Sequence, residues 1–182
     1  MIHHDIKPAN ILLTPDHPPT LRLIDFGIAK PFRIGIPTQR DHIQERRNVS
    51  GTLHWVSLNA QFGYGMFLLH HVCVRLFSYH LCDPDTSRRD DVESLAYTFL
   101  ILLCGSLPWQ QYYARSGTLF GCMKQVREKW LGQHLGEGFA KEYGDLLDYA
   151  RALKFERRPD YEGLRSSFQR LADSQAEEGV LL

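Results

Sequence analysis

The first thirty residues carry two short apolar runs separated by residues that favour turns. The runs are residues 11–13 and 21–24, and the stretch between them contains Pro15, Pro18 and Pro19. Runs this short suit strands rather than helices, and proline sets backbone angles that turns need. The pattern therefore predicts a small β hairpin that delivers polar residues at both of its ends.

After residue 87 the pattern becomes helical. Residues 95–104 carry no charge and are apolar on every side, and Asp90 or Asp91 can cap a helix that contains them. We expect this helix to lie inside the domain, because the run is much shorter than the roughly 20 residues that a membrane span needs. Segments with one apolar face predict further helices at 119–131, 139–154 and 160–173.

Three other stretches show no regular pattern. Residues 31–65 predict a long surface loop, a kind of segment that is usually functional in a compact domain. Residues 174–182 predict a loose tail. Residues 66–82 are apolar, yet they fit neither the alternation of a strand nor the stripe of a helix.

Three interpretations of residues 66–86 stay open. His71 with Cys73 and His80 with Cys82 offer zinc-ligand types, although the gap within each pair is shorter than zinc sites usually have. The segment can equally be a loop insertion, because surface loops tolerate extra length. It can also be translated intron, since the codons at its start can contain a splice-donor sequence.

Length and composition indicate one globular domain. The 182 residues are 43% hydrophobic and 23% charged, and 21 basic side chains balance 21 acidic ones, which gives no sign of a nucleic-acid partner. The four cysteines form no Cys-x-x-Cys pair, and no secretory pattern precedes them. We therefore expect reduced thiols and a location in the cytoplasm, the nucleus or both, with no membrane contact. Oligomeric state leaves no mark on the sequence.

The strongest chemical signal is a set of polar residues on either side of the predicted hairpin. Asp5, Lys7 and Asn10 precede the hairpin, and Asp25 follows it in the tripeptide Asp-Phe-Gly. These residue types at this spacing suit phosphoryl transfer. An aspartate can accept the proton of an attacking hydroxyl, and a lysine can neutralise the moving phosphoryl group. An asparagine and a second aspartate can hold Mg²⁺ against phosphates.

The two motifs together resemble the catalytic loop and the metal-binding loop of eukaryotic-type protein kinases. Later segments narrow the resemblance to the casein kinase 1 family: residues 50–52 with 57–60, where most kinases have Ala-Pro-Glu, and residues 87–95, 105–110 and 155–168. The resemblance implies a partial kinase domain over residues 1–173, interrupted by 66–86. Its implied fold is mainly α with a small β hairpin, like the C-terminal lobe of a protein kinase, with the N-terminal lobe absent.

The resemblance also implies how the accepting hydroxyl is handled. Asp5 would be the catalytic base, and Lys7 would stabilise the phosphoryl group in transfer. Thr52 would line the site that accepts the substrate hydroxyl. Lys7 followed by Pro8 fits specificity for serine and threonine rather than tyrosine.

ATP and Mg²⁺ are the cofactors that the resemblance implies. Asn10 and Asp25 would bind Mg²⁺, and Leu12 would form the floor beneath the adenine ring. Asp91, at the start of the apolar helix, would anchor the backbone of the catalytic loop.

Some positions depart from the family pattern. His4 stands where an arginine is usual, and imidazole is mostly neutral at pH 7. His54 and Tyr113 stand where the family has the arginine and lysine of a basic pocket for acidic or phosphorylated substrates. We expect protein substrates, but these departures leave open whether they are acidic or phosphorylated. Arg46 and Arg47 can partly replace the lost charge.

The 182 residues contain neither a Gly-x-Gly-x-x-Gly loop nor a Val-Ala-Ile-Lys strand, the parts that cover and hold the ATP phosphates in kinases. Because positioning supplies most of the catalysis in phosphoryl transfer, we expect this chain alone to be inactive or nearly so. Two alternatives remain. One is a non-catalytic module that binds proteins through the large-lobe surface, and the other is an incomplete gene model.

Overall fold

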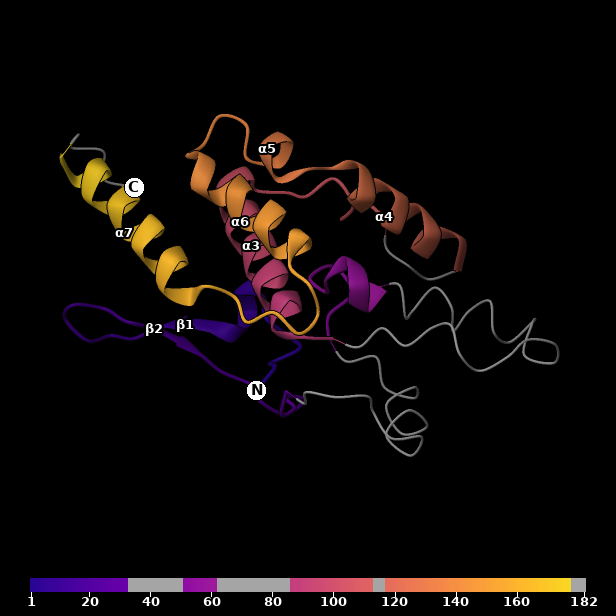
Figure 1. Cartoon of the computed structure of the whole chain (residues 1–182), viewed down its shortest axis with the longest axis horizontal. Helices are drawn as coiled ribbons and strands as arrows, with labels where there is room; N and C mark the ends of the chain where they lie inside the picture. Colours follow the sequence, from indigo (N-terminus) through magenta and orange to yellow (C-terminus); the bar gives the residue numbers. More distant parts are fainter. Residues whose placement is uncertain (33–50, 62–85, 113–116, 178–182) are drawn as a thin grey trace.

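The computed structural model describes residues 1–32, 51–61, 86–112 and 117–177, and for residues 117–121 it describes the backbone alone. This part of the chain is mainly helical, with one two-stranded antiparallel sheet (Figure 1). The predicted class of fold, helices with a small hairpin, is confirmed at that level. None of the described helices is long and apolar enough to cross a membrane.

The hairpin forms where the sequence predicts it. β1 (Ile11–Leu13) pairs with β2 (Leu21–Leu23), and Ile11 lies opposite Leu23. The strands are short, and most of their side chains are exposed. The hairpin therefore contributes little to the core, and its main effect is on the positions of the residues at its open end.

Two features fix the open end of the hairpin. A single 3-10 turn, η1 (Pro8–Asn10), leads into β1. Proline suits its first position, because the backbone N–H there has no acceptor within the helix and proline has no N–H to satisfy. Past β2, the backbone N–H of Ile24 donates to the carbonyl oxygen of Asn10 (2.9 Å). The residue that follows Ile24 is thus brought beside η1.

The central helix, α3 (Arg88–Cys104), begins earlier than the sequence suggests. Its N-cap is Ser87, whose backbone N–H donates to the carboxylate of Asp90 (2.5 Å). The prediction that Asp90 or Asp91 caps the helix is therefore wrong. Both aspartates lie in the first turn instead, where a negative charge is favoured by the positive end of the helix dipole.

Burial of α3 changes along its length. Ala96, Tyr97 and Leu100 are completely buried, whereas Leu102 is 68% exposed. The prediction of a helix enclosed on all sides thus holds only for its first three turns. Gly105 ends the helix with φ at +74°, a left-handed conformation that glycine adopts without a Cβ clash.

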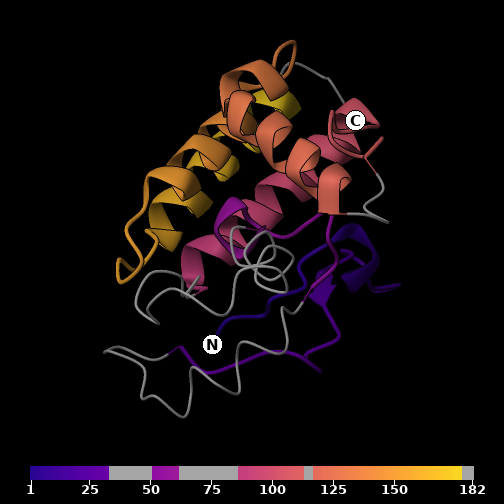
Figure 2. The ribbon, with the colours of Figure 1, turned by 90° about the vertical axis from the view of Figure 1, so that its right-hand side faces the viewer.

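The other helices gather around α3 and enclose one core. α6 (Lys141–Ala152) packs along α3, and α5 (Gly132–Leu135) and α7 (Tyr161–Glu177) pack against α6. Figure 2 shows α3 between α6 on one side and the hairpin on the other. α5 and α6 approach closely because they meet at glycines: a Cβ on Gly132 would lie 2.0 Å from the carbonyl oxygen of Gly144. The core takes its largest apolar side chains from α3, α4, α6 and the turn after α3: Tyr97, Leu100, Trp109, Met123, Leu146 and Leu147.

Three predicted amphipathic segments are helices, namely α4 (Gly117–Lys129), α6 and α7. α7 continues to Glu177, so residues 174–177, predicted as tail, are helical. The remaining tail residues, 178–182, lie outside the described residues.

The irregular segments are described only in part. Residues 51–61 form a turn followed by a helical turn at 58–61, which the prediction of a continuous loop over 31–65 missed. Residues 33–50 and 62–85 lie outside the described residues. The zinc, insertion and intron interpretations of 66–86 fall almost wholly on them.

Candidate active site

The carboxylate of Asp5 accepts hydrogen bonds from three other residues of the predicted site. Oδ1 accepts from the backbone N–H and the hydroxyl of Thr52, both at 2.9 Å. Oδ2 accepts from Lys7 Nζ (2.7 Å) and from Asn10 Nδ2 (3.1 Å). The structure therefore brings together four residues that the sequence singled out, although Thr52 lies 47 positions from Asp5.

Lys7 completes a small cycle of contacts at this point. Its ammonium group donates to Asp5 and also to Thr52 Oγ1, at 2.7 Å in each case. The Thr52 hydroxyl thus accepts from Lys7 and donates to Asp5. A substrate hydroxyl at the same place would meet a proton acceptor and a cation together, the combination that phosphoryl transfer to an alcohol requires.

The environment keeps Asp5 ionised. Burial alone would raise the pKa of this carboxyl group, but the hydrogen bonds from Lys7 and Thr52 stabilise the charged form more strongly and lower the pKa below its ordinary value of 3.8. At neutral pH the group is therefore a carboxylate, ready to accept a proton.

The backbone before Asp5 is anchored to α3. The Asp91 carboxylate accepts the N–H groups of His3 (2.7 Å) and His4 (3.0 Å), which confirms the predicted contact between the central helix and this loop. His4 has φ at +71°, a conformation uncommon for residues other than glycine. Two hydrogen bonds from one carboxylate hold the strained turn in place.

His3 joins the loop to the far side of the hairpin, a role that the sequence analysis missed. Its Nδ1 accepts from the N–H of Asp5 (3.3 Å), and its Nε2 lies 3.0 Å from the carbonyl oxygen of Ile24. A ring nitrogen that accepts requires the proton on the other nitrogen, so Nε2 donates to Ile24. The ring also meets Phe26 edge-on, with centroids 4.8 Å apart. The one feature of the sequence that could have pointed to this role of His3 is its position two residues before Asp5.

Asp25 lies at the open end of the hairpin and is exposed. Its φ is +63°, and its Oδ1 accepts weakly from the N–H of Gly27 (3.4 Å). The backbone bond between Ile24 and Asn10 places it at the same end as Asn10. No hydrogen bond among the described residues joins its side chain to Asp5 or Lys7. Asp25 is therefore not part of the hydrogen-bonded group that Asp5 forms with Lys7, Asn10 and Thr52.

The oxygen donors of Asn10 and Asp25 fit magnesium. Asn10 uses its amide nitrogen on Asp5, which leaves the amide oxygen to accept, and Asp25 offers an exposed carboxylate. Mg²⁺ commonly binds one or two protein oxygens and completes its shell with phosphates and water. Within the described ranges no group of three or more His, Cys, Asp or Glu side chains could hold a metal by itself.

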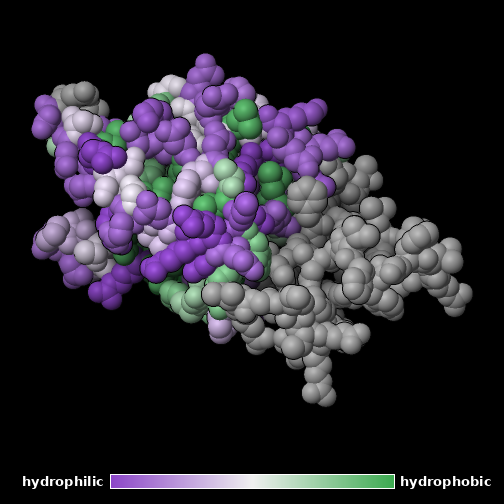
Figure 3. Space-filling view, in the orientation of Figure 1, coloured by the Kyte–Doolittle hydropathy of each residue, from purple (hydrophilic) through white to green (hydrophobic). Residues whose placement is uncertain are grey.

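Leu12, the predicted floor for adenine, is on β1 and is 49% exposed. Other exposed apolar side chains on the hairpin and after it are Leu13, Leu21, Leu23, Ile24 and Phe26. The register pairs Leu12 with Arg22, so Leu12 lies on the opposite face of the sheet from Leu13, Leu21 and Leu23. Figure 3 shows pale green, hydrophobic residues at the lower middle of the molecule, below the hydrophilic residues between α6 and α7. An exposed apolar surface can receive the flat face of a base, so the placement is compatible with the predicted role.

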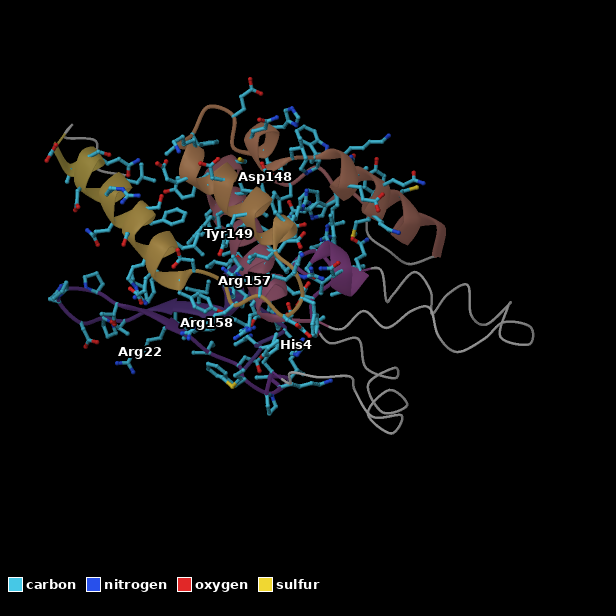
Figure 4. All side chains as sticks on the ribbon, viewed as in Figure 1. His4, Arg22, Asp148, Tyr149, Arg157 and Arg158 are labelled. Carbon is cyan, nitrogen blue, oxygen red and sulfur yellow. The ribbon has the colours of Figure 1, made fainter. Side chains whose placement is uncertain are left out.

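His4 and His54, two positions where the family resemblance leads us to expect arginine, are both neutral at pH 7 in this structure. Burial, with the nearby positive charge of Lys30 and the adjacent His3, lowers the pKa of His4 to about 4, so the ring is neutral at pH 7. Figure 4 shows His4 beside the start of α3. Burial and the charge of Arg127 also lower the pKa of His54. Neither histidine therefore supplies a positive charge at pH 7 where the resemblance leads us to expect an arginine. Tyr113, Arg46 and Arg47 lie outside the described residues.

The segment that carries Thr52 is also tied to α3. The hydroxyl of Ser57 donates to Asp90 (2.5 Å), and the N–H of Leu58 donates to Glu93 (3.2 Å). Glu93 in turn forms a buried ion pair with Arg151 of α6 (3.2 Å). One helix, α3, thus fixes both the loop with Asp5 and the segment with Thr52.

No family model matches this sequence. The case for a function therefore depends on the motifs and on the geometry described above.

Proposed function

We propose that residues 1–173 form the large-lobe part of a Ser/Thr protein kinase domain of the casein kinase 1 type. The reaction is transfer of the γ-phosphoryl group of ATP to serine or threonine hydroxyls of proteins in the cytoplasm or nucleus. The observation that carries the proposal is the convergence of Lys7, Asn10 and Thr52 on the carboxylate of Asp5.

Each side chain has a distinct task in this proposal. As the substrate oxygen bonds to the γ-phosphorus, its proton passes to Asp5 and the bond to the leaving ADP oxygen breaks. Lys7 neutralises the charge on the phosphoryl oxygens, and Asn10 with Asp25 would hold Mg²⁺. When bound, the metal ion would offset the negative charge of the phosphates.

We expect the rate of this chain alone to be low. Its 182 residues include no glycine-rich loop to cover the phosphates. Asp5 is also already satisfied by the hydroxyl of Thr52, which a substrate hydroxyl would have to displace. The same two observations favour the second candidate, a non-catalytic module that binds proteins through this surface.

Nucleotide binding separates the two candidates. A thermal unfolding experiment with Mg-ATP at ten times its Kd should raise Tm by about 3–5 °C if the phosphate half of the site is intact. Asp25→Asn should abolish the shift because it removes the charge that holds the metal. Asp16→Asn, an exposed aspartate in the connection between the strands, is the matched control and should leave the shift unchanged.

The outcomes exclude one another. A wild-type chain with no shift, or with a shift that survives Asp25→Asn, contradicts the kinase proposal and favours the binding module. Efficient phosphorylation of casein by this chain, lost in Asp5→Asn, would support the kinase proposal and refute the expected low rate.

A further inference from the structure

Arg127, on α4, is a buried cation that the site described above does not use. Its side chain is completely buried. Within the described residues no carboxylate forms an ion pair with it. An isolated buried charge is costly unless other polar groups satisfy it, so the partners of Arg127 show what the residue does.

The four hydrogen bonds that its side chain makes to described residues all go to a single segment, residues 53–61. Nη1 donates to the carbonyl oxygen of Val56 (2.7 Å) and to the side chain of Gln61 (3.1 Å). Nη2 donates to the carbonyl oxygens of Leu53 (2.9 Å) and His54. These partners are 66–74 positions away in the sequence, so the contacts are tertiary and join α4 to residues 53–61, the segment that follows Thr52.

Two aromatic rings hold the guanidinium in this position. Its central carbon lies 4.9 Å from the ring centre of Trp109 and 5.3 Å from that of Tyr97. The indole N–H of Trp109 also donates to the carbonyl oxygen of His54 (3.2 Å). The rings favour the cation electrostatically and restrict its rotation.

The carbonyl groups that Arg127 binds begin at Leu53, the residue after Thr52, and we call these hydrogen bonds of Arg127 the clamp. The Thr52 carbonyl accepts the N–H groups of Trp55 (2.8 Å) and Val56 (3.2 Å), which makes residues 52–56 a closed turn. On one side of the turn Arg127 binds carbonyl oxygens, and on the other side Thr52 donates to Asp5. Loss of the clamp would free the turn and, with it, Thr52.

We propose that Arg127 is a positioning residue that fixes residues 51–61 and thereby sets where Thr52, and the substrate hydroxyl that takes the place of its hydroxyl, meet Asp5. This inference rests on the proposed kinase function for its meaning, although the clamp itself is a feature of the fold. Lysine should replace the arginine only in part, because an ammonium group is a compact donor without the planar fork that spans several carbonyl groups.

Hydrogen–deuterium exchange of the full chain tests the clamp. In Arg127→Gln, amides in 51–61 should exchange at least about tenfold faster while α3 and α6 change by less than about twofold, and Arg127→Lys should fall between. Met123→Ala is the matched control: this residue is buried one turn earlier on α4 and belongs to the apolar core. It should speed exchange in α3 and α6 as well. Exchange in 51–61 that is unchanged in both Arg127 variants, or that rises only together with α3 and α6, overturns the proposal.

Two binding measurements link the clamp to the site. Arg127→Gln, or Arg127→Lys if the first variant does not fold, should keep the wild-type Tm shift with Mg-ATP and bind casein at least about fivefold more weakly. Unchanged casein affinity would overturn the positioning role. A wild-type chain without a Mg-ATP shift would contradict the proposed function, whereas the exchange result would still decide whether Arg127 clamps the segment.

Discussion

The two sides of the hairpin differ sharply in how their polar groups are held. Before β1, Asp5 is nearly buried and its carboxylate accepts four hydrogen bonds, and the backbone beside it is anchored to α3 by Asp91. After β2, Asp25 is exposed, with one weak hydrogen bond to its own loop. The polar groups of the first side are held by other groups of the protein, whereas on the second side the Asp25 carboxylate has only this weak hydrogen bond within the described part of the chain.

This difference matches the division of labour in phosphoryl transfer. A group that takes a proton must be placed within hydrogen-bond reach of the substrate before the reaction, so rigid placement is an advantage. A group that binds a metal–phosphate complex gets its partners from that complex. Changes on the Asp5 side should therefore alter stability, and changes on the Asp25 side should alter ligand binding.

The largest loss of stability is expected for Asp91→Ala. The change leaves the N–H groups of His3 and His4 without their acceptor, so the free energy of unfolding should fall by about 3 kcal/mol. Asp91→Asn keeps one acceptor oxygen and should lose about half as much. Urea denaturation at pH 7 measures both. A loss below about 1 kcal/mol in Asp91→Ala would show that the anchor is not a major support of the loop.

A smaller effect depends on pH and comes from His4. Its pKa is 6.5 in the unfolded chain and about 4 in the folded protein, so the unfolded chain binds the proton first as the pH falls. Wild type should therefore lose about 2 kcal/mol between pH 6.5 and 4, allowing for partial exposure to water, and none of this above pH 6.5.

His4→Asn isolates this contribution, because asparagine does not titrate and tolerates a positive φ. Unfolding free energies of the two proteins measured across the same pH range should diverge only below pH 6.5. Parallel curves would mean that His4 is not held neutral by burial.

Thr52→Val tests the Asp5 side of the hairpin. It removes the hydroxyl that donates to Asp5 and keeps the shape of the side chain, so the unfolding free energy should fall by about 1 kcal/mol at pH 7. Thr20→Val removes an exposed hydroxyl that pairs with Thr14 in the connection between the strands, and its effect should stay within about 0.5 kcal/mol.

The Thr52 effect should also depend on pH. The pKa of Asp5 is lower in the folded protein than the ordinary value of 3.8, so its hydrogen bonds stabilise the fold above that pH. The difference between wild type and Thr52→Val should shrink as the pH falls through the folded pKa of Asp5. A difference that stays constant down to pH 2 would contradict the assignment of the bond to the ionised carboxylate.

The sequence predicted most of what local spacing determines. The hairpin follows from two apolar runs around a proline-rich turn, and Asp5, Lys7 and Asn10 meet because they are within five positions of one another. The start of α3 was misplaced because Ser87 and Asp90 bond to each other, and either residue could be taken as the cap.

Two contacts over long distances in the chain were missed, whereas those of Thr52 and Asp91 with the loop around Asp5 were expected from the family resemblance. Arg127 reads in the sequence as one basic residue near the end of an amphipathic helix, a place where solvent exposure is the ordinary expectation. Its burial follows from carbonyl groups more than sixty positions away that turn toward α4. His3 was missed for the same reason, because its partner, Ile24, lies across the hairpin.

The central claim is that Asn10 and Asp25 hold one metal–nucleotide complex beside Asp5. Mn²⁺ with ATP tests it most directly, because this paramagnetic ion broadens the NMR signals of nuclei near it. We expect the amide signals of Asn10, Asp25 and Gly27 to broaden while those of α7 stay sharp, and Asp25→Asn to abolish the effect. Broadening of α7 in place of Asn10 and Asp25, or broadening that survives Asp25→Asn, would contradict a shared site.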